Sequence, residues 1–399
     1  MIVGADELPK FIRHYLEDYF DIIFSCDNWF AGGCTGTDID QDESGLDEWG
    51  NAQTAEYIEK ECEHRGIFWK DLRNKKILFL DIWERSLGLE GPNLNAVEVI
   101  YQLLSKHGIS FNKVYFSNND LNLCENSTRW IQWEKTWPNS PNSLSSMEWA
   151  IWKPKIDLPH YVHENFKGLD WTSFLYYHKT HENKILSDFN PNSNKKFMCL
   201  MGGGRPHRVK LWSLLNKSKI INDGHVSFMH EGISLDGVMF PQGVRAYDNS
   251  GLLPFFNDSL FSVIPENAFG TSSWFHHPTN TAEKVNIYDL KFISEKTWRV
   301  IATGHPFIIM GNKGILTYLK ERGYHTFPEL FDESYDGLEW SGEREMHIQH
   351  EILKLCSMEK SKLRDLCESV WWKVEHNRKL FYDEQSHKDY FLKDFYENI

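Results

Sequence analysis

Residues 292–311 have the sequence FISEKTWRVIATGHPFIIMG. Ser294 is a residue type that caps helix N-termini and Gly304 is one that follows helix ends, so we predict a helix between them. The proline-led apolar run at 306–310 is then typical of a buried strand. A helix that leads directly into a buried strand indicates an α/β domain built on a parallel sheet.

The same alternation occurs at two other places in the chain. In the N-terminal half, an apolar run at 76–81 precedes a helical pattern over 92–108 and a second apolar run at 113–116. In the C-terminal half, the apolar run 197–201 precedes a helical pattern over 207–216. Strand–helix–strand units of this length form parallel sheets. The sequence therefore predicts an α/β fold.

A polar, Asn-rich segment over 188–196, interrupted by Pro191, separates the two halves. Such a composition is typical of a linker. We therefore predict one α/β domain over residues 1–190 and a second over 191–399, the second ending in a helical tail.

Charge and cysteine content limit the class of protein. The net charge of -14 repels a phosphate backbone, so nucleic acid is disfavoured as a partner unless a local basic groove exists. Seven scattered cysteines with no C-x-x-C spacing argue against a disulfide framework and a structural zinc site, and they predict a reducing, cytoplasmic location. No signal sequence and no apolar stretch of about 20 residues is present, so we expect no membrane partner.

Glu295 and Lys296 fall in the first turn of the predicted helix that Ser294 begins. The N-terminus of a helix offers free N–H groups and a positive dipole end, which suit a phosphate. A lysine there opposes the dipole, and an anionic ligand would explain its presence. The neighbouring carboxylate could accept hydrogen bonds from a ribose. The alternative is an incidental Glu–Lys pair on the surface.

Three motifs, in this order, resemble the donor site of the alpha-1,3-fucosyltransferase family. Residues 204–215 (GRPHRVKLWSLL) and the following Asp223-Gly224 are similar to the arginine-bearing helix of that family and the strand after it. Residues 261–267 (FSVIPEN) are similar to its strand ending in Glu-Asn, and residues 294–311 to its Glu-Lys helix and Pro-hydrophobic-x-Gly strand. The continuation over 319–336 resembles viral and phage proteins grouped with such transferases.

This resemblance implies a glycosyltransferase of the GT-B type, in which two Rossmann-like domains face a cleft. It implies a metal-independent and inverting reaction, with a nucleoside-diphosphate sugar such as GDP-fucose as donor, a glycan or other hydroxyl as acceptor and no separate cofactor. The N-terminal domain would hold the acceptor and the C-terminal domain the donor. The residues implied at the donor site are Arg208 with Arg205 as its competitor for the diphosphate, Lys296 for the phosphates, Glu295 for the ribose, and Glu266, Asn267 and Ser294 lining the pocket.

An inverting transferase also needs a base to take the proton of the acceptor. Asp81, Glu84 and Asp120 are the acidic residues near predicted strand ends in the N-terminal half, and the sequence does not choose among them. The acidic run 38–42 mimics the start of a calcium loop, but Glu43 and Trp49 stand where such a loop needs Gly and Glu. We therefore predict no metal site.

The chain departs from the family pattern at three places. His305 precedes the proline where the family has a small or hydrophobic residue, Ala268 stands where Ser is frequent, and residues 270–291 form an insert. These departures bear on the donor sugar more than on the nucleotide-sugar class. Two other functions stay open: a glycosyltransferase acting on modified bases of phage DNA, and a non-catalytic protein that binds nucleotide sugars.

Overall fold

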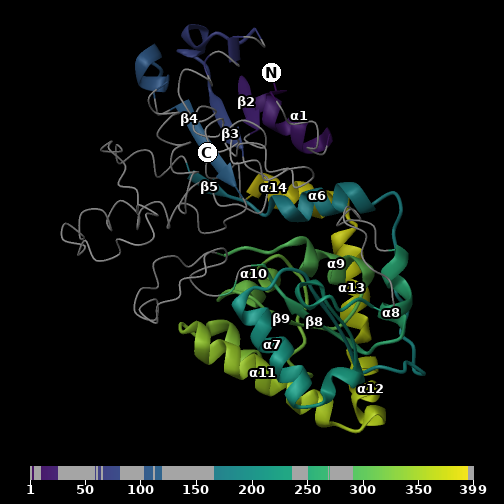
Figure 1. The fold of residues 1–399 in the computed structure, drawn as a ribbon. Coiled ribbons are helices and arrows are strands. Elements are labelled where there is room, and N and C mark those ends of the chain that lie inside the picture. Colours follow the sequence, from purple (N-terminus) through teal and green to yellow (C-terminus); the bar gives the residue numbers. More distant parts are fainter. Residues whose placement is uncertain are drawn as a thin grey trace, which may run out of the picture. The chain divides into compact units, whose positions relative to one another are not determined.

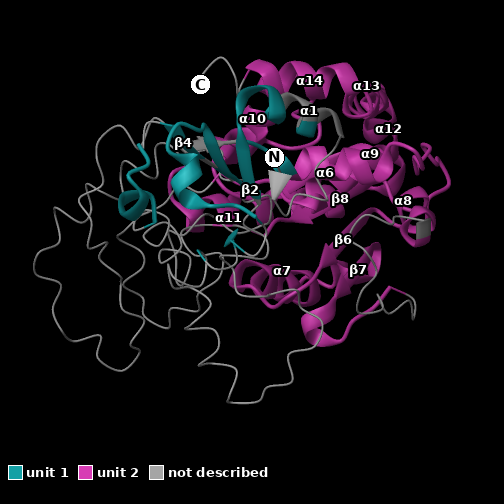
Figure 2. Cartoon of the chain, turned by 90° about the horizontal axis from the view of Figure 1, so that it is seen from above, with its two compact units in different colours: residues 1–171, 394–399 teal, residues 172–393 magenta. Residues whose placement is uncertain are grey.

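The computed structural model describes residues 2–3, 10–25, 59, 62–63, 66–80, 103–110, 113–118, 166–235, 250–267, 269 and 291–393. Its contacts divide the chain into two compact units, which Figure 2 colours separately. Unit 1 comprises residues 1–171 and 394–399, and unit 2 comprises residues 172–393. Each unit holds its own parallel sheet, so the predicted α/β class is confirmed.

Unit 1 is built on a five-stranded parallel sheet in the order β1-β2-β3-β4-β5. Its strands are β1 (Ile2–Val3), β2 (Ile22–Ser25), β3 (Ile77–Leu80), β4 (Val114–Asn118) and β5 (Phe166–Gly168). Its described helical segments include α1 (Lys10–Tyr19), the 3-10 helix η1 (Trp69–Leu72) and residues 103–107. Every residue of β3 is buried, as its unbroken apolar run predicts. Phe24 of β2 stacks on its register partner Phe79 with ring centroids 5.1 Å apart.

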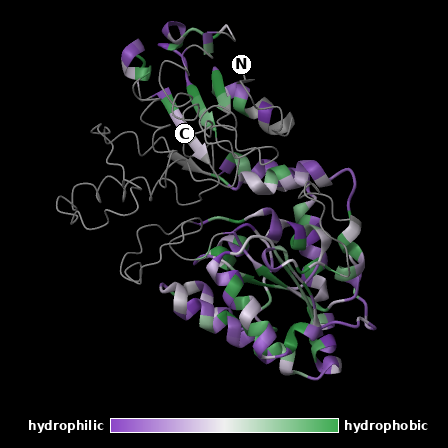
Figure 3. Cartoon of the chain, viewed as in Figure 1, coloured by the Kyte–Doolittle hydropathy of each residue, from purple (hydrophilic) through white to green (hydrophobic). Residues whose placement is uncertain are grey.

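Unit 2 is built on a four-stranded parallel sheet in the order β7-β6-β8-β9. Its strands are β6 (Phe197–Met201), β7 (Gly224–Phe228), β8 (Phe261–Pro265) and β9 (Phe307–Met310). All residues of β8 and β9 are buried, and the strands form the apolar centre of the unit in Figure 3. The predicted runs at 197–201 and 306–310 are therefore strands.

Helices cover both faces of this sheet (Figure 1). The connection from β6 through α7 (Pro206–Lys217) to β7 runs one way along the sheet, and that through α9 (Glu295–Thr303) from β8 to β9 runs the other way. Because such crossovers are right-handed, α7 and α9 lie on opposite faces. The other helices of unit 2 are α6 (Trp171–Thr180), which begins at the last residue of unit 1, α8 (Leu253–Asn257), α10 (Ile315–Glu321), α11 (Ser341–Ser357), α12 (Lys360–Ser369), α13 (Trp371–Phe381) and α14 (Glu384–Phe391).

Each of two long helices completes one of these faces. Helix α11 contacts both α7 and β9, whereas α13 contacts α9. On the second face, Trp298 of α9 is fully buried and stacks on Phe381 of α13, with ring centroids 5.8 Å apart. The hydrophobic side of α9 is thus held against α13, which leaves its other side turned toward β8.

The segment 188–196, which we expected to link two domains, lies inside unit 2, and the division falls between Trp171 and Thr172. Hydrogen bonds tie this segment to the residues just before β8. Asn190 Nδ2 donates to Asn257 O at 2.8 Å, and the backbone N of Asn194 donates to Asp258 Oδ1 at 2.8 Å. The polar composition that suggested a linker therefore serves side-chain hydrogen bonds within the unit.

Helix α6 has no counterpart in our sequence prediction. Its sequence WTSFLYYHKT is buried over most of its surface, so it lacks the polar stripe by which an amphipathic helix is recognised. Within the described ranges no helix combines the length and apolar character that a membrane crossing needs.

Candidate functional site

The strand order in unit 2 reverses between β6 and β8, because the connections that follow these two neighbouring strands run toward opposite edges of the sheet. Strands β6 and β8 are neighbours, but β6 continues toward β7 on one side and β8 toward β9 on the other. In open parallel sheets, ligands bind outside the carboxyl ends of the strands at such a point. The residues that follow these two ends are Gly202–Gly204 after β6, and Glu266 and Asn267 after β8.

Of the three glycines after β6, Gly204 permits a close approach of the chain to its surroundings. A Cβ atom at Gly204 would lie 2.5 Å from the ring of His230, which follows β7. At Gly202 the nearest atom to such a Cβ would be Arg208 Nη1 at 3.8 Å. The loop therefore brings the start of α7 next to the ends of β6 and β7.

Arg208 lies in the first turn of α7, and its side chain extends to the end of β8. Its side chain is 2% exposed. Its Nη2 donates to Asn267 Oδ1 at 2.7 Å, to Glu266 O at 2.9 Å and to Pro265 O at 3.2 Å. These bonds fix the backbone that follows β8. The resemblance implies that Arg208 binds the diphosphate. In the structure, its guanidinium instead forms hydrogen bonds with residues 265–267.

Two further side chains from the same turn hold the same segment. Arg205 Nη1 donates to Asn267 O. His207 Nε2 lies 2.9 Å from Glu266 O, and burial, followed by the charge of Arg208, lowers the pKa of His207 to about 3. A neutral imidazole can donate Nε2–H to this carbonyl. His207 is absent from our predicted site, although it lies inside the GRPHR motif.

Glu266 is fully buried and joins the end of β8 to the start of α9. Its carboxylate accepts hydrogen bonds from Ser294 N at 3.2 Å, from Asn267 N at 3.0 Å and from Thr297 Oγ1. A carboxylate beside a helix N-terminus is favourable because it faces free N–H groups and the positive end of the dipole. Glu266 thus positions α9, a role that differs from the pocket-lining role implied by the resemblance.

The start of α9 agrees with the prediction from sequence. Ser294 is the N-cap residue, and its hydroxyl accepts a hydrogen bond from Lys296 N at 3.2 Å. Lys296 Nζ lies 2.6 Å from Glu295 Oε1, in an ion pair whose side chains are 17% and 14% exposed. The local carboxylate therefore explains in part why a lysine is tolerated in this turn. The sequence argument had attributed it to an anionic ligand.

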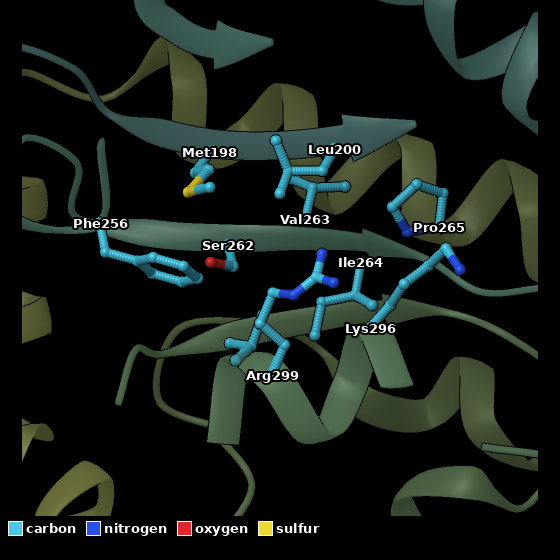
Figure 4. Close-up of a pocket in the computed structure, with 10 residues that line it drawn as sticks. Met198, Leu200, Phe256, Ser262, Val263, Ile264, Pro265, Lys296 and Arg299 are labelled. Carbon is cyan, nitrogen blue, oxygen red and sulfur yellow. The ribbon is translucent and has the colours of Figure 1, made fainter. Parts of the chain in front are cut away.

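A small pocket that is open to solvent lies between α9 and the faces of β6 and β8 (Figure 4). Met198 and Leu200 of β6 alternate onto one face, as Ser262 and Ile264 of β8 do. Figure 4 shows the guanidinium of Arg299 reaching over β8, and the ammonium of Lys296 near the carboxyl ends of the strands. The complete lining is Met198, Leu200, Phe256, Ser262, Val263, Ile264, Pro265, Lys296, Arg299 and Val300.

Two cations over an apolar floor are the chemical character of this pocket. Arg299 is missing from our predicted site residues, although its position three residues after Lys296 places both on one side of a helix. Glu266 and Asn267 are not among the described residues that line the pocket. Of the residues predicted from the sequence, Lys296 lines this pocket, whereas Arg299 was not predicted.

His305, one of the departures from the family pattern, has a structural explanation. Its Nε2 lies 2.9 Å from Ser259 O, and its Nδ1 lies 2.8 Å from Ser262 Oγ. The Nε2–H tautomer satisfies both contacts, since it donates to the carbonyl and accepts from the hydroxyl. Burial lowers the pKa of His305 to about 4, so the ring stays neutral at pH 7. It ties the start of β9 to β8.

Several predicted site residues lie outside the described ranges. They are the three candidate bases Asp81, Glu84 and Asp120, the acidic run 38–42, Ala268, and the insert 270–291 except for its last residue. Which residue acts as the base therefore stays a prediction. Within the described ranges, no group of three or more His, Cys, Asp or Glu side chains is placed to hold a metal ion.

Burial raises the pKa of the Cys199 thiol to about 12, which makes it a poor nucleophile.

Comparison of the chain with family models, with curated proteins and with solved structures gave no match. The likeness to the fucosyltransferase donor motifs therefore rests on the three quoted stretches alone.

Proposed function

We propose that unit 2 binds a nucleoside-diphosphate sugar and that the chain is a GT-B-type glycosyltransferase, with unit 1 as the acceptor domain. The observation that carries the proposal is the pocket between α9 and the sheet, where Lys296 and Arg299 stand over β8 at the point where the strand order reverses. A cationic side chain at the carboxyl ends of parallel strands, here Lys296, suits an anionic nucleotide, and Arg299 adds a second positive charge further along α9. The resemblance over 204–311 adds the donor class, with GDP-fucose as its most specific form.

The proposed reaction needs charge stabilisation and a base. The hydroxyl oxygen of the acceptor attacks the anomeric carbon, the bond from that carbon to the diphosphate breaks, and the nucleoside diphosphate leaves with the electron pair. Lys296 and its neighbours stabilise the negative charge that grows on the leaving group. Asp81, Glu84 or Asp120 takes the hydroxyl proton. Inversion at the anomeric carbon follows because the hydroxyl attacks from the side opposite the leaving diphosphate in a single displacement.

The first test is a thermal-shift panel of nucleoside diphosphates on the full chain. A ligand that binds only the folded state adds RT ln(1 + [L]/Kd) to its stability, so the correct base is identified by the largest shift. Nucleotide sugars of that base are then assayed for hydrolysis and transfer, with and without EDTA. We expect activity to survive EDTA. Binding without turnover on any hydroxyl acceptor would favour the non-catalytic binding protein.

The second test is Lys296→Ala. A charge-assisted contact to a phosphate contributes roughly 1.5–3 kcal/mol, so nucleotide affinity should fall about ten- to hundredfold. Stability should change little, because loss of the pair with Glu295 is offset by removal of a cation from the positive end of the helix dipole. Calorimetry and a melting curve measure the two effects.

Lys388→Ala is the matched control, because Lys388 forms an ion pair with Glu384 on α14 and does not line the pocket. It should leave nucleotide affinity unchanged. If Lys296→Ala also leaves affinity unchanged but lowers the melting temperature, Lys296 is a structural partner of Glu295, and the donor site must be sought elsewhere.

A further inference from the structure

Arg208 and Arg299 are both cations near the reversal point, but their surroundings differ. The guanidinium of Arg208 donates to three oxygens of residues 265–267 and is 2% exposed. To meet a ligand, it would have to give up bonds to buried carbonyl oxygens that need donors. Arg299 is partly exposed and lines the pocket.

The position of Arg299 on α9 matches that of Lys296. Residues three apart on a helix are neighbours on one side, with Cβ atoms about 5–6 Å apart. Both side chains line the same pocket, Lys296 at the carboxyl ends of the strands and Arg299 one turn further along the helix (Figure 4). An arginine can contact two phosphate oxygens at once, whereas a lysine acts as a point charge. Together they suit a ligand with two adjacent anionic groups.

We propose that Lys296 and Arg299 form the diphosphate-binding pair of unit 2, and that Arg208 is a positioning residue that holds the end of β8. The inference rests on the proposed function for the identity of the ligand. It reassigns the second cation from Arg208, which the resemblance implies, to Arg299. It also predicts selectivity: a diphosphate engages both cations, whereas a monophosphate engages one.

The test measures the affinity of the full chain for inorganic pyrophosphate, orthophosphate, GDP and GMP by calorimetry. Arg299→Met keeps the aliphatic part of the side chain and removes its charge, and Arg299→Lys keeps the charge. Arg299→Met should weaken pyrophosphate and GDP roughly ten- to hundredfold and orthophosphate and GMP much less, so the preference for a diphosphate collapses. Arg299→Lys should restore part of it. UDP replaces GDP if the thermal-shift panel selects uridine.

Two further variants separate binding from folding. Arg208→Lys should lower the melting temperature, because the lysine side chain is one atom shorter than the path to Arg208 Nη2 and its ammonium falls short of the three oxygens. The preference for a diphosphate over a monophosphate should persist. Arg364→Ala is the matched control for lost guanidinium charge, since Arg364 pairs with Asp365 on α12 outside the pocket. It should bind pyrophosphate like the unaltered chain.

The results distinguish this inference from the proposed function. If Arg299→Met binds GDP and pyrophosphate normally, and Arg208→Lys loses the diphosphate preference at an unchanged melting temperature, the reassignment is overturned while the transferase proposal stands. If pyrophosphate binding depends on Arg299 but no nucleoside diphosphate binds more tightly than pyrophosphate, the anion-binding pair is supported and the nucleotide-sugar proposal falls.

Discussion

At the carboxyl end of β8, buried polar side chains form a connected set. Arg208 and His207 meet the carbonyl oxygens of the segment after β8, and Glu266 meets N–H and O–H donors at the start of α9. Buried polar groups contribute to stability only when their partners are present. Each residue here therefore acts through geometry, by fixing where α7, β8 and α9 lie relative to one another.

The prediction at this scale concerns Glu266→Gln. The amide keeps the shape of the side chain but turns one acceptor into a donor, which then faces the N–H groups of Ser294 and Asn267. We expect a loss of about 1–3 kcal/mol in the free energy of unfolding, measured with urea. Glu384→Gln is the control, because Glu384 likewise lies at the N-terminal end of a helix but is 52% exposed. Equal stability of the two variants would show that Glu266 does not hold α9.

At the scale of the element, α9 connects the fold to the candidate site. One side packs on α13 through Trp298, and the other presents Lys296 and Arg299 to the pocket. Its N-terminus is held by two acceptors, the Ser294 hydroxyl and the Glu266 carboxylate. The position of both cations therefore depends on how well the first turn of the helix is fixed.

Removal of the cap by Ser294→Ala tests this dependence. Loss of an N-cap costs about 0.5–2 kcal/mol, and the frayed first turn should also weaken nucleotide binding because Lys296 lies in it. Asp383→Ala removes the corresponding cap of α14, where Asp383 Oδ1 accepts from Gln385 N. It should cost comparable stability without loss of affinity. Parallel losses of affinity in both variants would trace the effect to global destabilisation.

At the scale of the whole molecule, three histidines in the described part of unit 2 are buried and neutral. Burial is the main cause that lowers the pKa of His207 to about 3, of His305 to about 4 and of His387 to about 3. In the unfolded chain the pKa of a histidine is about 6.5. Between these values the unfolded state binds more protons, so stability is fully present above pH 6.5 and is lost as the pH falls toward 4.

Unit 2 should therefore be acid-labile, with a loss of about 2 kcal/mol per buried imidazole between pH 7 and pH 5. His305→Gln retains a donor for Ser259 O and does not titrate, so it should be less stable at pH 7 but lose less on acidification. His376→Gln changes an exposed ring and should keep the slope of the unaltered chain. Urea unfolding at several pH values measures both. Equal slopes in all three proteins would refute this account of the acid lability.

The sequence alone determined where most strands and several helices of the described chain lie. The apolar runs at 76–81, 113–116, 197–201 and 306–310 each overlap a strand, because a short unbroken apolar run between polar segments is typical of a strand that is buried on both faces. Ser294 was identifiable as an N-cap because capping depends on a side chain and N–H groups only a few residues away. Information of this kind is local, so one sequence is enough.

Only the tertiary structure decided which residues meet. The order β7-β6-β8-β9 pairs β6 with a strand more than sixty residues later, and no local pattern encodes that choice. This strand order brings Arg208 within hydrogen-bond distance of the end of β8, and it places N–H donors around the carboxylate of Glu266. It also places Arg299 in the lining of the pocket. A periodicity specifies that a side chain is buried or exposed, but its partner depends on packing between distant segments. For this reason the sequence located the start of α9, but only the structure showed that Arg205 and Arg208 bind the segment after β8 whereas Arg299 lines the pocket.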